Sequence, residues 1–355
     1  MITRRKTTQI KVGQFTIGSD NPIRVQSMTK TPTENISITV RQIKKLESAG
    51  CEIIRVAVPD KNSAKVLGKI KEKISIPLVA DIHFDPELAL IAIEQGIDKL
   101  RLNPGNIKNK LKIKEIAKKA LKNNIPIRIG LNSGSVPREL LDKYDNNIAK
   151  ALVEAALWEI ELLEKEDFDK IIISLKSSNV ITTIDAYKML AKKCSYPFHI
   201  GITEAGTMFQ GLIKSSSGIG ILLYEGFGDT LRVSLTENPV NEVNAGFKIL
   251  EALNIRKRGF EIISCPTCAR CGGNVKYISK IIEKQFLNEP KKLKVAVMGC
   301  VVNGPGEAKD ADIGIAFGKN DAVLFSDGKL RRKISENAVL KEFIKEIKIK
   351  LRNRS

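Results

Sequence analysis

The sequence predicts an α/β protein in which a (β/α)8 barrel is followed by a small α+β domain. Two observations indicate the barrel. The first 240 residues repeat a unit, a short β-branched run followed by an amphipathic helical pattern, and this unit occurs eight times. A third observation, the change of pattern after about residue 255, indicates the second domain. We place the two domains at residues 1–256 and 257–355.

The expected strands follow one another along the first domain. They occupy residues 22–28, 53–60, 76–84, 99–106, 125–135, 170–178, 197–206 and 230–239. Helical patterns lie between them, and the one in 86–96 begins at Pro86 and ends at Gly96. Strands that alternate with helices form a parallel sheet. A doubly wound open sheet is the alternative, but no G-x-G-x-x-G motif follows the first strand.

The remaining segments complete the expected fold. Residues 7–18 have the pattern of a hairpin that precedes the first strand and closes the floor of the barrel. In the second domain we expect a strand that runs into a cysteine-rich loop, then a helix and a strand that ends at Cys300. Further strands with a glycine turn and a final amphipathic helix follow.

The composition, 43% hydrophobic and 28% charged, is typical of a soluble globular protein. No apolar run is long enough to span a bilayer, and the basic N-terminus lacks the apolar segment of a secretory signal. We therefore expect a cytoplasmic protein. A reducing compartment disfavours structural disulfides, so clustered cysteines indicate metal or redox chemistry.

The net charge of +19 raises the question of a nucleic-acid partner. Aromatic residues make up only 5% of the chain, and no nucleic-acid-binding motif is present. Many lysines fall on the expected solvent side of helical patterns, as in residues 108–124. The charge is therefore explained by solvated helix faces, and no nucleic-acid partner is predicted.

Charged residues recur where the expected strands end, which is the catalytic end of barrel enzymes. Side chains two apart on a strand share a face, as do Arg101 and Asn103, and Arg232 and Ser234. If these faces point inward, five cations converge on the mouth of the barrel: Arg55, Arg101, Arg128, Lys176 and Arg232. Buried like charges repel one another unless an anion neutralises them, and arginine matches phosphate oxygens in pairs. The pattern predicts a substrate with more than one phosphate.

Other polar residues at the strand ends are candidates for the same site. Asp81 and Glu204 are the acids that we place among the cations, and Asn132 follows Arg128 on the same face. His83 shares a face with Asp81 and is a candidate substrate contact, whereas His199 lies early in its strand and is expected to be a packing or surface residue. Glu204 is either a helix-start acid or a catalytic one; its position at the mouth favours catalysis.

Three cysteines at every third position, Cys265, Cys268 and Cys271, indicate a metal site. The ferredoxin run requires a further Cys-Pro three residues on, whereas Gly272 and Gly273 follow here. With the distant Cys300, four thiols are also compatible with a zinc site. Cys51 and Cys194 are expected to be ordinary thiols. The residues alone therefore leave the metal open between iron–sulfur and zinc.

Five motifs together carry a resemblance to a known family. "DIHFD", "RIGLNSGS", "TEAG", "SCPTCARC" and "VMGCVVNGPGE" resemble, in the same order, the 4-hydroxy-3-methylbut-2-en-1-yl diphosphate synthases of the non-mevalonate isoprenoid pathway. The resemblance covers nearly the whole chain. It implies a barrel followed by a ferredoxin-like, sulfite-reductase-like domain that carries a [4Fe–4S] cluster. The implied cluster ligands are Cys265, Cys268, Cys300 and Glu307, and Cys271 lies outside this ligand pattern.

The resemblance also implies the activity. This is the reductive ring opening and dehydration of 2-C-methyl-D-erythritol 2,4-cyclodiphosphate to (E)-4-hydroxy-3-methylbut-2-enyl diphosphate, with two electrons from flavodoxin or ferredoxin. It implies a proton donor at Glu204 and a homodimer whose sites are completed in trans. The implied substrate contacts are Arg55, Arg101, Arg128, Asn132, Lys176, Arg232 and Ser234. A zinc-stabilised barrel hydrolase and a zinc-ribbon nucleic-acid-binding protein remain the alternative classes.

Overall fold

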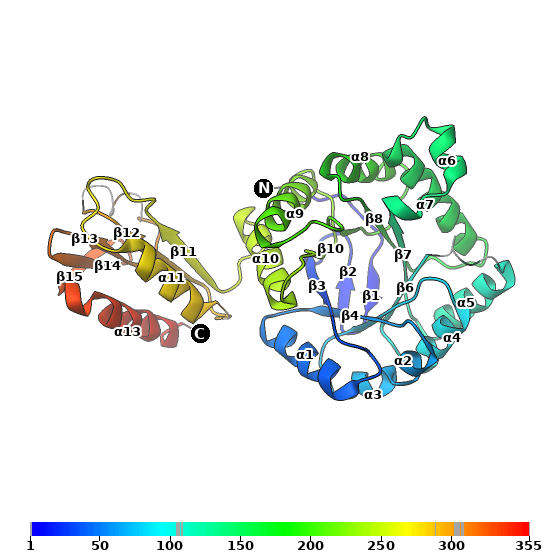
Figure 1. The fold of residues 1–355 in the computed structure, drawn as a ribbon, viewed down its shortest axis with the longest axis horizontal. Coiled ribbons are helices and arrows are strands. Elements are labelled where there is room, and N and C mark those ends of the chain that lie inside the picture. Colours follow the sequence, from blue (N-terminus) through cyan, green and yellow to red (C-terminus); the bar gives the residue numbers. More distant parts are fainter. Residues whose placement is uncertain are drawn as a thin grey trace. The chain divides into compact units, whose positions relative to one another are not determined.

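The computed structural model describes residues 2–103, 107, 109–287, 289–301, 306 and 309–354. The chain divides into two compact units, Met1–Arg256 and Lys257–Ser355 (Figure 1). Each unit has its own sheet and its own hydrophobic core. None of the helices in the described part of the chain is both long and apolar enough to cross a bilayer.

The first unit is a parallel β-barrel, as predicted. Its strands are hydrogen-bonded in the order β8-β7-β6-β5-β4-β3-β10-β9, and a bridge between Ile173 and Phe198 closes the ring from β8 to β9. The barrel strands are β3 (Arg24–Met28), β4 (Ile53–Ala57), β5 (Leu78–Asp81), β6 (Lys99–Leu102), β7 (Ile127–Asn132), β8 (Ile171–Lys176), β9 (His199–Ile200) and β10 (Thr230–Leu231). All eight predicted strands are present, so the open-sheet alternative is wrong.

Helices surround the barrel and pack on it through their apolar faces (Figure 1). They are α1 (Ile36–Ser48), α2 (Lys61–Lys65), α3 (Leu67–Lys71), α4 (Pro86–Glu94), α5 (Lys110–Lys122), α6 (Arg138–Lys143), α7 (Ile148–Glu164), α8 (Val180–Leu190), α9 (Met208–Tyr224) and α10 (Pro239–Ala252). Pro86 occupies the first turn of α4, and Gly96 follows its end with a φ of +72°, a conformation that glycine adopts without strain.

Asparagine begins many of these helices. The side chains of Asn35, Asn147 and Asn179 each accept a hydrogen bond from a backbone N–H in the first turn of α1, α7 and α8. Such a cap satisfies a donor that has no partner inside the helix. These helices therefore begin at defined residues in the segments that follow the strand ends.

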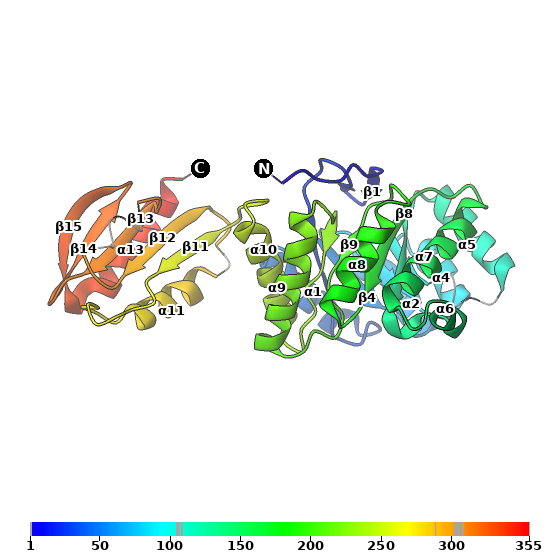
Figure 2. The same ribbon diagram turned by 90° about the horizontal axis from the view of Figure 1, so that it is seen from above.

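The predicted hairpin closes the floor of the barrel. Strands β1 (Ile10–Val12) and β2 (Phe15–Ile17) pair antiparallel. Figures 1 and 2 show them across one end of the barrel. Side chains of the hairpin pack against inward-facing barrel residues in one buried cluster: Ile10, Val12, Ile17, Ile53, Val79 and Ile172. The barrel interior is thus apolar at the floor, and polar side chains are left to the other end.

The second unit is a mixed five-stranded sheet with helices on one face. Its order is β11-β12-β13-β14-β15, with the first three strands parallel and the last two antiparallel. The strands are β11 (Phe260–Ser264), β12 (Leu293–Met298), β13 (Ile313–Phe317), β14 (Asp321–Ser326) and β15 (Lys329–Ser335). Helices α11 (Val275–Phe286) and α13 (Val339–Arg352) bury their apolar sides on the sheet, as the amphipathic patterns predicted.

Candidate active site

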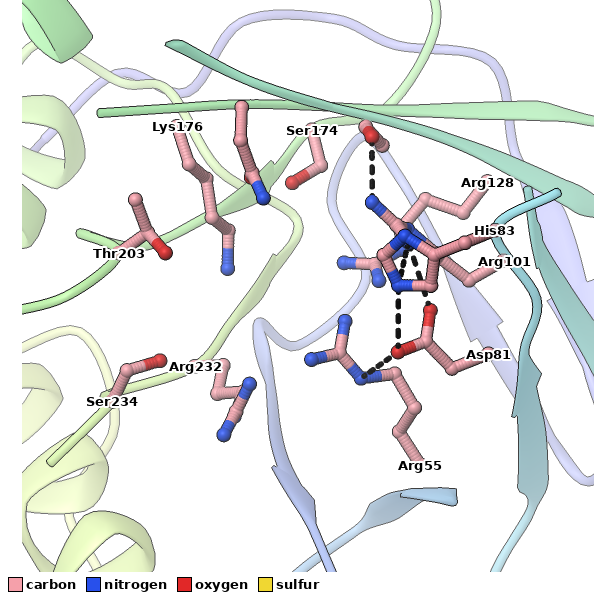
Figure 3. Close-up of a pocket in the computed structure, with 12 residues that line it drawn as sticks. Arg55, Asp81, His83, Arg101, Arg128, Ser174, Lys176, Thr203, Arg232 and Ser234 are labelled. Carbon is pink, nitrogen blue, oxygen red and sulfur yellow. Dashed lines mark hydrogen bonds and ion pairs between the residues drawn. The ribbon is translucent and has the colours of Figure 1, made fainter. Parts of the chain in front are cut away.

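A cavity opens at the carboxyl ends of the barrel strands (Figure 3). We call it the mouth cavity; its lining residues are Arg55, Asp81, His83, Arg101, Arg128, Gly130, Asn132, Ser174, Lys176, Thr203, Arg232 and Ser234. The nine residues proposed from sequence as substrate contacts are all in this set. Gly130, Ser174 and Thr203 were not predicted, although Gly130 and Ser174 lie two residues before Asn132 and Lys176 on their strands and Thr203 directly precedes Glu204.

Asp81 has several cationic or polar partners on one side of the mouth cavity. Its carboxylate lies 3.1 Å from Nη1 of Arg101, 3.8 Å from Nε of Arg55 and 3.6 Å from Nε2 of His83. Arg101 also donates to the carbonyl oxygen of Gly130 at 2.7 Å. Burial opposes ionisation of Asp81, but Arg55, His83 and Arg101 outweigh it and hold the pKa of this carboxyl well below its usual range. Asp81 therefore stays charged and fixes two of the five cations.

Arg128 and Lys176 differ from the other cations of the cavity. Their side chains are 1% and 6% exposed, and no carboxylate is paired with either among the residues that the structure describes. Burial and neighbouring cations, with Arg55 and Arg101 acting on both, lower the pKa of each side chain well below its ordinary value. Figure 3 shows their nitrogen atoms directed into the same space. These are the positions where an anion is most needed.

Glycine makes room for these long side chains. A Cβ atom at Gly130 would lie 2.4 Å from Nε of Arg101. At Gly201, which follows β9, it would lie 3.0 Å from Nζ of Lys176 and 2.4 Å from the carbonyl oxygen of Arg232. Both glycines thus allow cationic side chains to extend across the inside of the barrel.

A second polar layer lies inside the barrel, and sequence reasoning missed most of it. Lys99 is fully buried, and its Nζ donates to Oε1 of Gln26 at 2.9 Å. His199, expected to be a packing or surface residue, is fully buried, with Nδ1 2.8 Å from Oγ1 of Thr230. Burial, followed by Arg128, lowers the pKa of both Lys99 and His199. The signal for Lys99 was available, because it lies two residues before Arg101 and shares its face.

Glu204 lies just outside this set. It follows Thr203, a lining residue of the mouth cavity, and its own side chain is exposed. Its φ of +50° lies in the left-handed region, which costs a non-glycine residue free energy and is common at functional sites. The structure therefore places Glu204 at the rim of the mouth and not among the lining residues.

The cysteine-rich loop leads from the end of β11 to the start of α11 and lies beside the end of the neighbouring parallel strand, β12. The N–H of Cys265 bonds to the carbonyl oxygen of Val297, and the N–H of Gly272 bonds to that of Gly299, so both ends of the loop are held against the end of β12. Cys300 follows two residues after that strand. Cys265, Cys268 and Cys300 are thus carried by neighbouring strand ends, with Cys268 exposed in the loop.

Hydrogen bonds distinguish the loop thiols from one another. The sulfur of Cys265 accepts the N–H of Thr267 at 3.4 Å. The Cys271 thiol instead donates to the carbonyl oxygen of Gly273 at 3.1 Å and packs against the hydrophobic core of the unit. Glu307 lies outside the described residues. Within the described ones, no three potential ligands are gathered in a metal-binding arrangement. The soft thiols of Cys265, Cys268 and Cys300 nevertheless suit an iron–sulfur group.

Fold and site together define a (β/α)8-barrel protein with a polycationic mouth and a separate cysteine-bearing unit. Comparison with family models is specific: the GcpE TIM-barrel domain matches residues 7–247, and the GcpE protein C-terminal domain matches residues 261–349. The chain belongs to the GcpE family. This bears out the family resemblance found in the sequence.

Curated relatives agree along the full length. The chain is 54% identical to 4-hydroxy-3-methylbut-2-en-1-yl diphosphate synthase (flavodoxin) of Thermodesulfovibrio yellowstonii, over 98% of this chain and 100% of the relative. Its identity to the enzyme of the same name from Geobacter sulfurreducens is 52%, over 97% and 98%. Among solved structures, dihydropteroate synthase from Stenotrophomonas maltophilia matches with a TM-score of 0.52 at 14% identity, over 71% of this chain and 100% of that one. That likeness concerns the barrel fold alone.

Proposed function

We propose that this protein is an iron–sulfur enzyme that converts 2-C-methyl-D-erythritol 2,4-cyclodiphosphate into (E)-4-hydroxy-3-methylbut-2-enyl diphosphate. The reaction opens the ring and removes one oxygen as water, and it consumes two electrons. The names of the relatives support flavodoxin as the donor. The observation that carries the proposal is the mouth cavity, in which five cations face a single lining acid. A cyclic diphosphate supplies the missing negative charge.

The protein's own residues would bind and orient this substrate. Arg128 and Lys176, which have no carboxylate partner among the described residues, are the positions we assign to the phosphoryl oxygens. Arg55 and Arg101, fixed by Asp81, would hold the remaining oxygens in a defined direction. Asn132 and Ser234 line the same cavity and would bind the sugar-derived hydroxyl groups. Glu204 at the rim would hold the proton that the departing oxygen requires.

We further propose that Cys265, Cys268 and Cys300 hold a [4Fe–4S] cluster, with the Glu307 carboxylate as the fourth ligand. Bound there, the cluster would supply electrons one at a time, which amino-acid side chains do not do. The inward hydrogen bond of the Cys271 thiol supports its exclusion from the ligand set. A carboxylate among three thiolates is a harder ligand on a soft cluster and is easier to displace.

The experiment that tests the cofactor is anaerobic purification followed by iron and sulfide analysis and an absorption spectrum. We expect about four irons per chain in the wild type and in Cys271→Ser, and loss of iron in Cys265→Ser, Cys268→Ser and Cys300→Ser. Loss of iron in Cys271→Ser together with retention in Glu307→Ala would assign the fourth ligand to Cys271. A colourless protein with stoichiometric zinc would contradict the proposed function.

The mouth also supports a dimer. Exposed apolar side chains lie in the first two turns of barrel helices or shortly after a strand, which is the mouth side of the barrel: Ile38, Phe84, Leu111, Ile181, Phe209 and Ile213. Phe84 and Phe209 are 71% and 80% exposed, and a ring of such residues is typical of an interface. Because α10 ends at the floor, where Arg256 bonds to Ile23 and Glu52, the chain leaves the barrel on the side away from the mouth.

We propose a head-to-tail homodimer in which the cysteine-bearing unit of the partner subunit covers the mouth. The test is complementation between Arg128→Ala, which disables the mouth, and Cys300→Ser, which disables the cluster. After subunit exchange, each mixed dimer should contain one competent site, and activity should return. If exchange is demonstrated and activity stays absent, or if the active species is a monomer, the arrangement is wrong.

A further inference from the structure

A buried carboxylate, Glu242, lies beside the mouth cavity without lining it. It is in the first turn of α10, and its side chain is 1% exposed. Neither the sequence motifs nor the strand-end pattern includes it, because it reaches the mouth from a helix. Buried carboxylates are costly unless they are paired, so the partners of Glu242 indicate what it does.

Each oxygen of Glu242 has two partners. Oε1 accepts the N–H of Leu235 at 3.1 Å and lies 3.3 Å from Nζ of Lys30. Oε2 accepts from Oγ of Ser27 at 3.4 Å and lies 3.7 Å from Nη2 of Arg232. The carboxylate thus joins the segment after β3, the segment after β10 and the start of α10.

Lys30 binds the same backbone segment as Glu242, the one that follows β10, through its carbonyl oxygens. Its Nζ donates to the carbonyl oxygen of Leu235 at 2.8 Å and also to that of Glu237. Both backbone polar groups of Leu235 are therefore held, the N–H by Glu242 and the carbonyl by Lys30. Ser234, which lines the mouth cavity, directly precedes this fixed residue, and Arg232 lies two residues further back.

Arg232 has its own acid partner, separate from the one that serves Arg55 and Arg101. Among the residues that the structure describes, Glu242 is the carboxylate within ion-pair distance of Arg232, whereas Arg55 and Arg101 share Asp81. The Nε atom of Arg232 is buried and has no hydrogen-bond partner within the described part of the chain. The guanidinium is consequently directed by one acid and retains N–H groups for another set of oxygens.

We propose that Glu242 is a positioning residue that orients Arg232 and, with Lys30, the segment carrying Ser234, so that both meet the anionic substrate. The inference rests on the proposed function, since it takes a diphosphate as the ligand of the mouth cavity. Glu242 acts through Arg232 and the Ser234 segment and is not itself a lining residue of the mouth cavity.

The direction of the change in substrate affinity distinguishes a positioning role of Glu242 from a simple effect of its charge. Replacing Glu242 by glutamine removes a negative charge beside an anion site, and this charge change alone strengthens anion binding. Loss of orientation weakens it. We expect Glu242→Gln to bind the cyclic diphosphate roughly tenfold more weakly, because charge-assisted contacts to a buried arginine are lost.

The measurement is calorimetric titration of the full-length protein with the cyclic diphosphate, without reductant, so that no turnover occurs. Glu52→Gln is the matched control: Glu52 also accepts a backbone N–H and pairs with Arg24 and Arg256, but it precedes β4 at the floor. The affinity of Glu52→Gln for the cyclic diphosphate should equal that of the wild type. In an Arg232→Ala background, Glu242→Gln should change the affinity less than it does in the wild type, because the part of the effect that acts through Arg232 is then absent.

Glu242→Asp is a second variant, which keeps the charge and shortens the reach; it should also weaken binding, and it decides the matter if Glu242→Gln does not fold. Unchanged or tighter binding by the folded variants, or an undiminished effect of Glu242→Gln in the Arg232→Ala background, would overturn the positioning role and leave the proposed function standing. Absence of binding by the wild type, or undiminished binding by Arg128→Ala, would overturn the proposed function and the inference with it.

Discussion

The two ends of the barrel differ in how their charged side chains are paired. At the floor, Glu52 pairs with Arg24 at 2.7 Å and with Arg256 at 2.8 Å, and an apolar hairpin fills the interior. At the mouth, five buried or half-buried cations face Asp81 alone among the lining residues. Buried charge without a partner lowers stability, whereas paired charge maintains it. The floor is therefore organised for stability, and the mouth keeps an imbalance that only a ligand relieves.

The largest expected effect is a loss of activity on substitution of a cation at the mouth. Arg128→Ala should lower kcat/KM by about 10³, because a buried cation without a carboxylate partner loses its contact with the substrate phosphate. The melting temperature of the ligand-free protein should not fall, because repulsion from Arg55 and Arg101 is relieved at the same time. Steady-state kinetics and thermal unfolding measure the two quantities. A normal kcat/KM would show that Arg128 is a structural residue.

The next effect separates binding from chemistry at the rim of the mouth. Glu204→Gln should lower kcat by about 10² while the dissociation constant of the cyclic diphosphate stays within a few-fold, since general acid catalysis is typically worth that much. Single-turnover kinetics and calorimetry give the two numbers. Unchanged turnover would reduce Glu204 to an acid at the start of a helix.

At the floor the same kind of substitution should affect stability and not binding. Glu52→Gln is expected to lower the free energy of unfolding by about 2 kcal/mol, because two half-buried cations, Arg24 and Arg256, lose their charged partner. Urea denaturation of the two proteins measures this difference, and unchanged kcat/KM is the accompanying expectation. A loss of activity without loss of stability would contradict the division between the two ends.

The pH dependence sharpens this prediction. Burial raises the pKa of Glu52, but Arg256, the N–H of Val25 and Arg24 outweigh burial and lower it. A lowered pKa means that the folded protein holds the charged form more strongly than the unfolded chain does. The stabilisation is therefore fully present above the unfolded pKa of about 4.3 and is lost as the pH falls through the folded value. The difference between wild type and Glu52→Gln should shrink below that pH.

The smallest expected effect concerns the polar layer inside the barrel. Lys99→Met should raise the free energy of unfolding of the ligand-free protein by about 1 kcal/mol, because a fully buried cation next to Arg128 is replaced by an apolar chain of similar length. Binding of the cyclic diphosphate should weaken a few-fold. Denaturation and calorimetry test both, and a destabilised variant would show that the bond to Gln26 outweighs the buried charge.

The sequence by itself determined the order of strands and helices, the floor hairpin and most of the mouth. Alternation of strand and helix patterns predicts a parallel barrel, and a parallel barrel brings all strand ends to one side. Residues such as Arg101 and Arg128 could therefore be placed together although distant in the chain. The period of two along a strand supplied their direction. The cysteine spacing located the candidate metal loop in the same way, from local information.

Only the tertiary structure decided which groups share a partner. Asp81 pairs with Arg55 and Arg101, while Glu242 pairs with Arg232 from beside the mouth cavity, on a helix whose inward residues do not follow the period of two of a strand. His199, expected to be a packing or surface residue, is packed inside the barrel among cations, and Gly201 is needed because Lys176 crosses above it. These facts depend on distances between segments far apart in the chain, and the sequence pattern carries local periodicity but not those distances.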